Sequence, residues 1–598
     1  MENEEHLEAM TERRPTAALE DTPVFHPLLL AVCPILGLYA YNVGNVPWTA
    51  LLRPLIVALV CAQLLQWILW AILRDKHKAG VVASALLLAL MWGWSLLETG
   101  IAMASRNLQT VEPPVAYGVL GILVFLSALV VYAWNRADKR RALLRAGLFL
   151  VIVLLGALTI AVLLDRIYGT VASTFILAFV GLVTGCIVYL VAWRRDFRPW
   201  TRTANWFGLI LVTLYVALIV FNVPRTDKLP AAAPEMPGLT AQASADSPDI
   251  YFILLEGYAR CDVLLRLYGH NDLPALEALQ DLKMTVESTA FANYPWELQS
   301  AISVLNMDYL DHLVPPDSPE DLDIAQFHEF YHRNRFFRTL HDAGYEILAY
   351  SPGVQAIEPG PLVDRCLAPP RTPSEFEVVL LQNTACKRLL EVGCYARGRD
   401  TRSWQLGFRR ARVNYVFDTM GTLAGEPHER PRLVFAHVTV PDPPFIFERK
   451  GEPADPRRRR SLEERYLGQL HYVSTRVTDT VQQITERATR PSVILLISAQ
   501  GPRIRITEDS IEPEALAEHF GVFASTRYPD KAPDAGGPPP KGGSLVNVLR
   551  HTLNRVLDAD LPLLEDRALL TPMQTPLQSR PVTVPTLEHV VVPALEPR

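Results

Sequence analysis

The feature that most constrains this chain is a series of apolar runs confined to its first 222 residues. A helix needs about twenty mostly apolar residues to cross the hydrocarbon core of a bilayer. Seven runs reach or approach that length, at residues 27–43, 55–73, 81–102, 115–134, 146–164, 171–193 and 205–221. The pattern predicts an α-helical membrane bundle of about seven spans. The first run is the weakest because Pro34 interrupts it, and a position in the membrane interface is the alternative.

The basic residues predict how this bundle is oriented. Lys and Arg accumulate in the short loops that face the cytoplasm. The loops after the second, fourth and sixth runs are the basic ones, and they contain Arg74, Lys76, Lys78, Arg136, Lys139, Arg140, Arg141, Arg145, Arg194, Arg195, Arg198 and Arg202. The alternate loops hold little more than Arg53, Arg106 and Arg166. We therefore expect a cytoplasmic N-terminus and an extracytoplasmic C-terminal part.

Composition divides the chain into five stretches. Residues 1–24 form a polar tail, 25–222 the helical bundle, 223–247 a Pro/Ala-rich linker, 248–570 a water-soluble domain, and 571–598 a Pro-rich tail. The linker has no helical or strand period, which is typical of an extended segment. We expect the last tail to wrap the domain surface or to be disordered. The net charge of −6 is small and evenly mixed, which excludes nucleic acid as an expected partner.

The soluble domain alternates short apolar runs with helical patterns. Strand-like runs cover residues 250–255, 346–350, 433–440, 492–498 and 520–525, and helical patterns cover 325–343 and 462–484. Ser461 and Glu464 have the spacing of a capping box at the start of the second helix. This alternation predicts an α/β domain with a mostly parallel central sheet.

Polar residues follow three of these strands and start one helix. Glu256 ends the first run, Asp442 follows the third, and Ala499-Gln500 follows the fourth. Chemistry collects at the carboxyl ends of strands in such sheets. Pro295 marks a helix start, with Glu297 in its first turn, where backbone N–H groups could hold an anion.

The cysteines outside the apolar runs are Cys261, Cys366, Cys386 and Cys394. If this part of the chain is extracytoplasmic, one or two disulfides are possible. The last three residues are the expected partners. The sequence does not decide their connectivity. Cys261 follows the first strand, and a small buried side chain is the favoured interpretation over a reactive thiol.

Together these segments resemble the alkaline phosphatase superfamily. The resemblance is to its membrane-anchored, sulfatase-like bacterial branch, which includes lipoteichoic acid synthases and phosphoethanolamine transferases. It covers nearly all of residues 249–570 and rests on Pro248-Asp249-Ile250-Tyr251, Asn293-Tyr294, Leu305-Asn306-Met307-Asp308-Tyr309-Leu310, Phe435-Ala436-His437, Pro443-Pro444-Phe445, and Val546-Asn547 through Leu561-Pro562-Leu563-Leu564-Glu565-Asp566-Arg567. It implies a protein of the bacterial inner membrane with a periplasmic domain. Its ancestors would have acted on phosphate or sulfate esters of envelope glycans or lipids.

The resemblance also implies a site, and the chain departs from it. Family members use a Thr or Ser nucleophile at a helix start and one or two divalent metals. The nucleophile position falls on Glu297, which has no hydroxyl group. Glu256 takes the place of the usual first-strand Asp, as it does in the lipoteichoic acid synthases. Asp442 stands in place of a His, and Ala499 and Gln500 stand in place of an Asp-His pair of metal ligands.

Three interpretations follow from these changes. In the first, the domain is a catalytically impaired pseudoenzyme that binds an envelope glycan, a lipid headgroup or a partner membrane protein. In the second, Glu256, Glu297 and Asp442 hold one divalent cation, Mg²⁺, Ca²⁺ or Mn²⁺, through oxygen atoms. Glu297 would then be a carboxylate nucleophile in a remodelled hydrolase or transferase. In the third, a shifted register hides a hydroxyl nucleophile, with Ser300, Ser288 and Thr289 as candidates.

Each site residue also has a purely structural interpretation. Glu297 would be favoured in a first helical turn by the helix dipole. Asp442, between prolines, is typical of a turn. His437 lies in an apolar strand, which favours a core histidine. A different class of function, a sensor or transport accessory based on the membrane bundle, would require polar residues inside several helices, and these are scarce.

Overall fold

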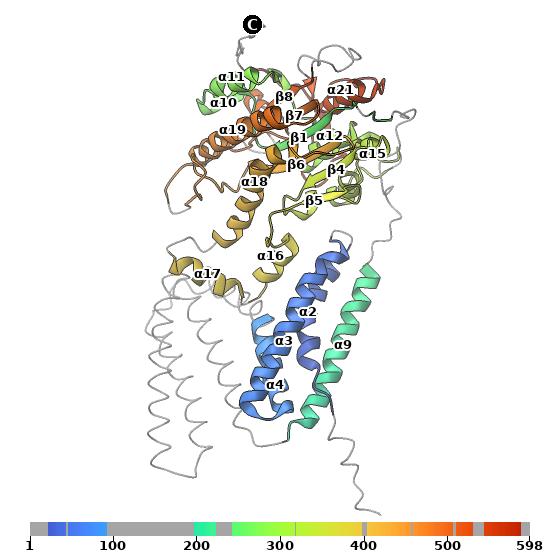
Figure 1. The fold of residues 1–598 in the computed structure, drawn as a ribbon, viewed down its shortest axis with the longest axis vertical. Helices are drawn as coiled ribbons and strands as arrows, with labels where there is room; N and C mark the ends of the chain where they lie inside the picture. The colour runs from blue at the N-terminus through green and yellow to red at the C-terminus, as the bar shows by residue number, and fades with distance from the viewer. Residues whose placement is uncertain are drawn as a thin grey trace, which may run out of the picture. The chain divides into compact units, whose positions relative to one another are not determined.

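The computed structural model describes residues 22–587, apart from 44–45, 92–195, 223–241, 245, 317, 385, 398–402, 456–457, 506–509 and 530–542. The chain forms two compact units. The helical unit comprises Met1–Pro224 and Phe376–Thr401, and the sheet unit comprises Arg225–Glu375 and Arg402–Arg598. Figure 1 shows both units with their helices and strands labelled.

The helical unit contains long apolar helices. Its elements are α2 (His26–Tyr41), η1 (Trp48–Leu51), α3 (Leu52–Leu73), α4 (Lys76–Met91) and α9 (Arg198–Asn222). Helix α2 packs against α3, α4 and α9, and Asn205 of α9 accepts a hydrogen bond from the backbone N–H of His26 at 3.0 Å. Large apolar side chains on the outer faces of α3 and α9 are exposed, among them Ile56, Trp67, Trp206 and Ile210. Such surfaces are favourable in lipid and costly in water.

Two described helices are long and apolar enough to cross a membrane, Trp48–Leu73 and Arg198–Asn222, and His26–Tyr41 is a shorter apolar helix. These three correspond to the second, seventh and first predicted runs. The third run begins in α4 and continues beyond the described residues. The fourth, fifth and sixth runs lie outside the described residues, as do most of the linker and the tail after residue 587. The number of seven spans therefore stays a prediction.

A segment of the C-terminal half belongs to the helical unit. Helices α16 (Glu375–Gln382) and α17 (Cys386–Ala396) contribute to it. Phe376 is buried against Ile35 and Val46, and Glu377 forms an ion pair with Arg53. Both contacts join this segment to other residues of the helical unit. In sequence, however, the segment lies between β5 and β6 of the sheet unit.

The sheet unit is built on a seven-stranded sheet of order β2-β8-β7-β1-β6-β4-β5. The strands β7, β1, β6, β4 and β5 run parallel to one another. Near one edge, β8 is antiparallel to both of its neighbours, β7 and β2. Their bounds are β1 (Asp249–Glu256), β2 (Thr285–Val286), β4 (Glu346–Tyr350), β5 (Arg365–Leu367), β6 (Arg432–Pro441), β7 (Ser492–Ser498) and β8 (Ala524–Arg527). Two small sheets pair β3 (Ala290–Phe291) with β9 (Gly543–Ser544) and β10 (Ala568–Leu570) with β11 (Arg580–Val582).

Helices cover both faces of this sheet (Figure 1). One face carries α12 (Glu297–Asn306), α13 (Leu310–Leu313), η2 (Ile324–Phe327), α14 (His328–His332), α15 (Arg335–Asp342), η3 (Gln355–Ile357) and α21 (Val546–Leu557). The other carries α10 (Cys261–Tyr268), α11 (Leu273–Asp281), α18 (Ser403–Ala424), α19 (Leu462–Arg487) and α20 (Pro513–Phe520). The sheet unit is thus a three-layer α/β/α domain.

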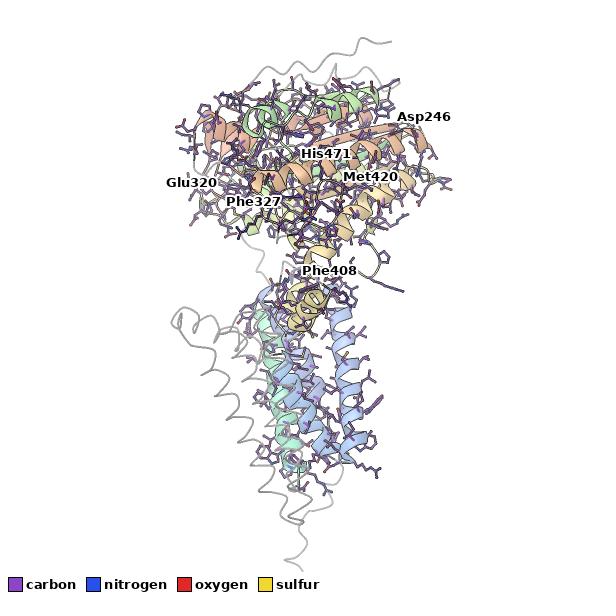
Figure 2. The ribbon with its side chains drawn as sticks, turned by 90° about the vertical axis from the view of Figure 1, so that its left-hand side faces the viewer. Asp246, Glu320, Phe327, Phe408, Met420 and His471 are labelled. Atoms are coloured by element: carbon purple, nitrogen blue, oxygen red, sulfur yellow. The ribbon has the colours of Figure 1, made fainter. Side chains whose placement is uncertain are left out.

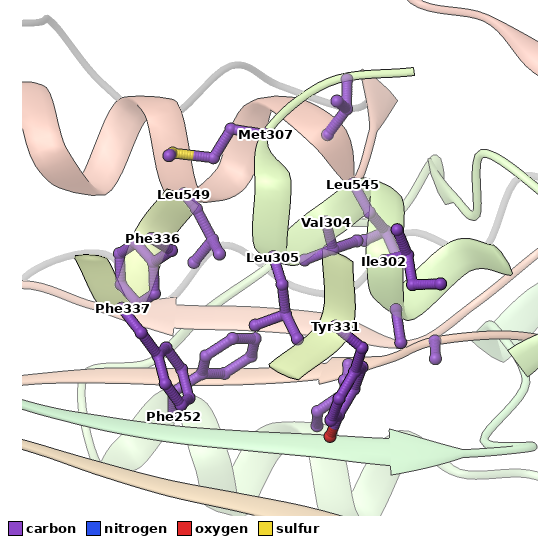
Figure 3. Close-up of a cluster of buried hydrophobic side chains, with 14 of the residues drawn as sticks. Phe252, Ile302, Val304, Leu305, Met307, Tyr331, Phe336, Phe337, Leu545 and Leu549 are labelled. Carbon is purple, nitrogen blue, oxygen red and sulfur yellow. The ribbon is translucent and has the colours of Figure 1, made fainter. Parts of the chain in front are cut away.

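Strand β1 is buried on both faces. Ile250, Phe252 and Leu254 belong to one hydrophobic core, and the alternate residues belong to the other. Figure 3 shows Leu305 of α12 and Phe336 of α15 packed over Phe252 in the first core. Phe327 of the first core and Met420 of the second are labelled among the side chains of Figure 2. Burial on both faces explains why β1 is a continuous apolar run.

Most predicted elements are present. The runs at 346–350 and 492–498 match β4 and β7, and the capping box of α19 forms through both Ser461–Glu464 hydrogen bonds, at 2.9 and 3.1 Å. Two predictions are wrong in detail. Residues 520–525 divide between the end of α20 and β8, because α20 continues through Phe520. Residues 325–343 form η2, α14 and α15, because Asn334 caps a new helix through the N–H of Phe337 at 2.8 Å.

The expected disulfides are absent from the described residues, where Cys261, Cys366, Cys386 and Cys394 are free. Cys386 and Cys394 lie eight residues apart on α17, which separates them by about 12 Å along the helix. A disulfide requires Cα atoms within about 7 Å of each other. Cys366 lies on β5 in the other unit.

Candidate functional site

The site lies at the carboxyl end of β1, the central strand of the sheet. Glu256 is the last residue of β1 and is buried. Gly257 follows in a left-handed conformation, with φ of +77°, and a Cβ atom there would lie 3.0 Å from Oδ1 of Asp442. Only glycine combines this backbone conformation with so close a neighbour. The turn therefore places Asp442, from the end of β6, directly beside β1.

Glu297 approaches the same point from α12. Trp296 is the N-cap residue and makes no side-chain cap hydrogen bond, so Glu297 is the first helical residue. As a residue Glu297 is half-buried, whereas Glu256 and His437 are buried. The predicted helix start at Pro295 is confirmed to within two residues. Ile302 and Leu305 of α12 belong to the same core as Phe252 and Leu254 of β1 (Figure 3), so the helix packs on the face of the sheet that contains this strand.

His437 of β6 completes a cluster with the two glutamates. One potential ligand atom from each of Glu256, Glu297 and His437 lies within 4.8 Å of the other two. Nε2 of His437 lies 3.0 Å from Oε1 of Glu256, and neither atom has a hydrogen-bond partner in the described part of the chain. We call these three residues the EEH cluster. The sequence interpretation of His437 as a core histidine missed it, although its place four residues before the end of β6 puts it next to Leu254 of β1.

The other face of the imidazole is held by Tyr331 of α14. The Tyr331 hydroxyl and Nδ1 of His437 are 2.9 Å apart, and the two rings are stacked. Such a partner fixes the orientation of a histidine and leaves its other nitrogen to face a ligand. Tyr331 is also a residue that the sequence patterns did not single out.

Asp442 lies on a loop that α19 clamps. Its backbone N–H donates to the carbonyl of Glu256 at 2.9 Å. Gln469 is fully buried and donates to the carbonyls of Pro441 and Asp442, both at 3.1 Å, and it accepts from the N–H groups of Ile446 and Phe447. Oδ1 of Asp442 is buried and has no described partner. Asp442 is thus fixed beside the EEH cluster but outside its ligand geometry.

Gln500 and Ala499 follow β7, the strand next to β1. The N–H of Ala499 donates to Leu255 at 2.8 Å, and the N–H of Gly257 donates to the Gln500 carbonyl at 3.1 Å. Gln500 is fully buried, and neither atom of its side-chain amide has a partner among the described residues. A buried amide without partners is costly in a structural role.

Burial dominates the electrostatics of the site. It raises the pKa of Glu256 to about 7, and it raises that of Glu297 to about 8 with help from the charge on Glu256. Burial also raises the pKa of Asp442 to about 7 and lowers that of His437 to about 4. At neutral pH the imidazole is uncharged, as a metal ligand must be.

Two arginines contribute positive charge to the site. Arg503 lies in the loop after β7 and lowers the pKa of Glu256, Glu297 and Asp442, while Arg409 of α18 lowers that of Glu256 and Asp442. Among the described residues neither guanidinium has an ion-pair partner. The sequence patterns did not identify these arginines because single basic residues on a loop and a helix carry no motif.

The EEH cluster fits one divalent cation. Four-coordinate ligands at about 2.0–2.2 Å from Zn²⁺ are themselves about 3–4 Å apart, which the spacing within 4.8 Å allows. The imidazole nitrogen changes the expectation of a cation held by oxygen alone, because imidazole suits Zn²⁺ while the two carboxylates suit ions such as Mn²⁺. Bound there, the cation would supply charge neutralisation and polarise an ester oxygen.

The hydroxyl candidates are not equivalent. Ser288 and Thr289 are exposed in the turn between β2 and β3, and α12 carries neither of them. Ser300 lies one turn after Glu297, fully buried, with an Oγ atom that has no described partner.

Comparison with known proteins gives structural matches alone. No protein-family model and no curated protein matches the sequence. The chain is similar to the C-terminal periplasmic domain of EcEptC from Escherichia coli in complex with Zn, with 12% identity, 58% of this chain and 94% of that chain covered, and a TM-score of 0.38.

Two further matches are similar in kind. The integral membrane protein lipooligosaccharide phosphoethanolamine transferase A from Neisseria meningitidis matches at 10% identity over 80% of this chain and 88% of its own, with a TM-score of 0.36. A protein in the alkaline phosphatase superfamily from Vibrio parahaemolyticus matches at 11% identity over 58% and 79%, with a TM-score of 0.34. The chain is similar to members of the alkaline phosphatase superfamily, as the sequence predicted.

Proposed function

We propose that this chain is a multi-pass protein of the bacterial inner membrane, with a cytoplasmic N-terminus and a periplasmic sulfatase-like domain that binds one divalent cation. The cation and its surroundings would bind an ester group of an envelope glycan or lipid headgroup without transferring it. The observation that carries the proposal is the EEH cluster, in which two carboxylates and a neutral imidazole converge at the carboxyl end of the central strand.

The position of Glu297 supports binding over transfer. A nucleophile needs a free lone pair that faces the substrate. A carboxylate oxygen of Glu297 lies within 4.8 Å of potential ligand atoms of both Glu256 and His437. It therefore acts as a third ligand, and the position that would carry a hydroxyl nucleophile has a carboxylate instead.

One observation favours the alternative, a remodelled metal-dependent hydrolase or transferase. Glu297 is partly exposed, whereas the other two members of the cluster are buried. The Glu297 carboxylate could attack the phosphorus or sulfur atom of an ester and expel the alcohol. The resulting acyl phosphate or acyl sulfate would be hydrolysed by water, which releases phosphate or sulfate and restores the carboxylate. The two functions differ in one respect that can be measured, turnover.

The test uses the full chain in detergent micelles, loaded in turn with Zn²⁺ and Mn²⁺. Hydrolysis of bis-4-nitrophenyl phosphate, 4-nitrophenyl phosphate and 4-nitrophenyl sulfate is compared between the wild type and Glu297→Gln. We expect bound metal in the wild type and no turnover above that of Glu297→Gln. Turnover that disappears in Glu297→Gln would establish the remodelled enzyme instead. Ser300→Ala is the matched control for a hidden nucleophile on the same helix.

A further inference from the structure

Arg503 is a charged residue outside the EEH cluster, and its guanidinium forms no ion pair with a described acidic side chain. Its Cζ atom lies 4.4 Å from the centroid of the Trp296 ring, so the side chain is laid on the indole. Its Nε atom is buried and has no hydrogen-bond acceptor among the described residues. An arginine held by stacking keeps its N–H groups free to bind an anion.

Trp296 is itself held in place. Its indole N–H donates to the carbonyl of Thr571 at 2.9 Å, and Gln299, one turn along α12, donates to the carbonyls of Pro572 and Met573. The chain after β10 thus fixes the platform on which Arg503 lies. Trp296 immediately precedes Glu297, so the guanidinium lies on the residue next to a member of the EEH cluster.

The formal charges of the site indicate the charge of the ligand that this guanidinium would bind. The two carboxylates of the EEH cluster balance a divalent cation, and Asp442 balances one of the two arginines, Arg409 and Arg503. One positive charge remains. Gln500, three residues before Arg503, adds a fully buried amide that has no hydrogen-bond partner among the described residues. The N-terminus of α12, which has no side-chain cap, adds free backbone N–H groups and a partial positive charge.

We propose that Arg503, stacked on Trp296, is a specificity-determining residue that binds a singly charged tetrahedral ester, a phosphodiester or a sulfate monoester, at the metal. This inference rests on the proposed metal-binding function and deepens it, because it states which ester the site selects. A phosphate monoester carries close to two negative charges at neutral pH and exceeds the one that remains unbalanced. Planar guanidinium groups bind such oxyanions through paired N–H donors.

The experiment measures two affinities on the full chain in detergent. Isothermal titration first gives the affinity for Mn²⁺, and then that of the Mn²⁺-loaded protein for diethyl phosphate, methyl sulfate and methyl phosphate. We expect diethyl phosphate or methyl sulfate to bind more tightly than methyl phosphate. Arg503→Met should weaken the preferred anion by about 10- to 100-fold, the usual effect of losing hydrogen bonds to a charged group. Its affinity for Mn²⁺ should be unchanged or higher, because a nearby positive charge is removed.

Two further variants keep the test decisive. Arg503→Lys retains the charge but loses the planar stack, so we expect a smaller loss of anion affinity than in Arg503→Met. Arg555, whose Cζ lies 4.6 Å from the Tyr528 ring, gives a stacked arginine away from the site, and Arg555→Met should change neither affinity.

The outcomes separate the two proposals. Unchanged anion binding in Arg503→Met, or a preference for methyl phosphate, would overturn the role of Arg503 while leaving the metal site intact. Absence of Mn²⁺ binding in the wild type would overturn the metal site. Anion binding that still depended on Arg503 in that case would leave the anion role standing. Preference between diethyl phosphate and methyl sulfate identifies the class of ester.

Discussion

Strand β1 carries a buried acid at each end, and the two acids have opposite surroundings. At the start, Oδ1 of Asp249 accepts hydrogen bonds from the N–H of Arg432 at 2.9 Å and from Nε2 of His428 at 3.0 Å, with Arg490 Nε at 3.8 Å. At the other end, Glu256 meets Glu297 and Asp442, and burial raises its pKa to about 7. We call the start of β1 the matched end, because Asp249 faces basic side chains there. We call the other end the mismatched end, because Glu256 faces two further acids.

The difference separates a structural role from a functional one. Buried polar groups in folded proteins are nearly always hydrogen-bonded, and exceptions require an explanation. Both ends of β1 have such exceptions, but at the start Oδ2 of Asp249 lies among basic side chains, 2.9 Å from Nε2 of His428. At the other end the exceptions are Oε1 of Glu256, Nε2 of His437, Oδ1 of Asp442 and the amide of Gln500, which lie among acids. A divalent cation and an anionic ligand would satisfy them, which is why we assign binding to this end and stability to the other.

Substitution at the matched end should give the largest effect. Asp249→Asn removes the buried carboxylate that His428, Arg432 and Arg490 surround, and removal of one partner of a buried ion pair costs about 3 kcal/mol or more. We expect a lower free energy of unfolding, measured by denaturant titration of the full chain in detergent. Affinity for Mn²⁺ should not change. A loss of metal affinity comparable to that of Glu256→Gln would break the distinction between the two ends.

Substitution at the mismatched end should act on the metal instead. Glu256→Gln removes a ligand, and we expect affinity for Zn²⁺ or Mn²⁺ to fall by about 100-fold or more, since loss of an outer partner alone costs about 10- to 100-fold. Stability without metal should be maintained or raised, because a buried charge is removed from a like-charged cluster. Competition titration with a metal-binding dye measures the affinity. A stability loss like that of Asp249→Asn would assign Glu256 a structural role.

The pH dependence of metal binding sharpens the same point. Protons compete with the cation for Glu256 and Glu297, whose pKa values are raised to about 7 and about 8. Affinity should therefore rise by about tenfold per pH unit for each proton displaced, up to about pH 8, and then level off. His437, with a pKa lowered to about 4, stays neutral over this range and adds no dependence. Glu297→Gln should flatten the rise, and an unchanged slope in that variant would contradict the assignment.

The smallest effect should come from Tyr331. Tyr331→Phe removes the hydroxyl that contacts Nδ1 of His437 at 2.9 Å, and we expect metal affinity to fall by about tenfold. Tyr528→Phe is the matched control, because that buried hydroxyl contacts Thr552 at 3.0 Å away from the cluster. Equal effects of the two substitutions on metal affinity would show that Tyr331 acts only through general packing.

The sequence predicted the sheet unit well, for reasons that are local. Apolar runs such as residues 346–350 and 492–498 are buried on both faces, so periodicity and length identify them directly. The capping box of α19 depends on two residues three positions apart. The antiparallel strand β8 was harder to predict from the sequence. It follows α20 after three residues, and its short apolar run is continuous with the end of that helix. The inclusion of residues 376–401 in the helical unit depends on contacts distant in sequence.

For the site, sequence reasoning reached the positions but not the chemistry. Glu256 and Glu297 were identified from strand and helix ends, and the structure places them together. His437 was not predicted as a site residue, because it lies in an apolar strand and its partner, Glu256, lies on a different strand. Parallel pairing of β1 with β6 brings it beside Leu254, and the side chains then meet at the strand end. The role of Arg503 depends on its stacking on Trp296, which no spacing in the sequence predicts.

The most direct test of the account is the metal content of the purified full chain. The protein is incubated with Zn²⁺ or Mn²⁺ and desalted, and bound metal is measured by inductively coupled plasma mass spectrometry in parallel with His437→Ala and Asp249→Asn. We predict one metal ion per chain in the wild type and in Asp249→Asn, and none in His437→Ala. Absence of metal from the wild type, or equal metal in His437→Ala, would contradict the claim that Glu256, Glu297 and His437 form a cation site.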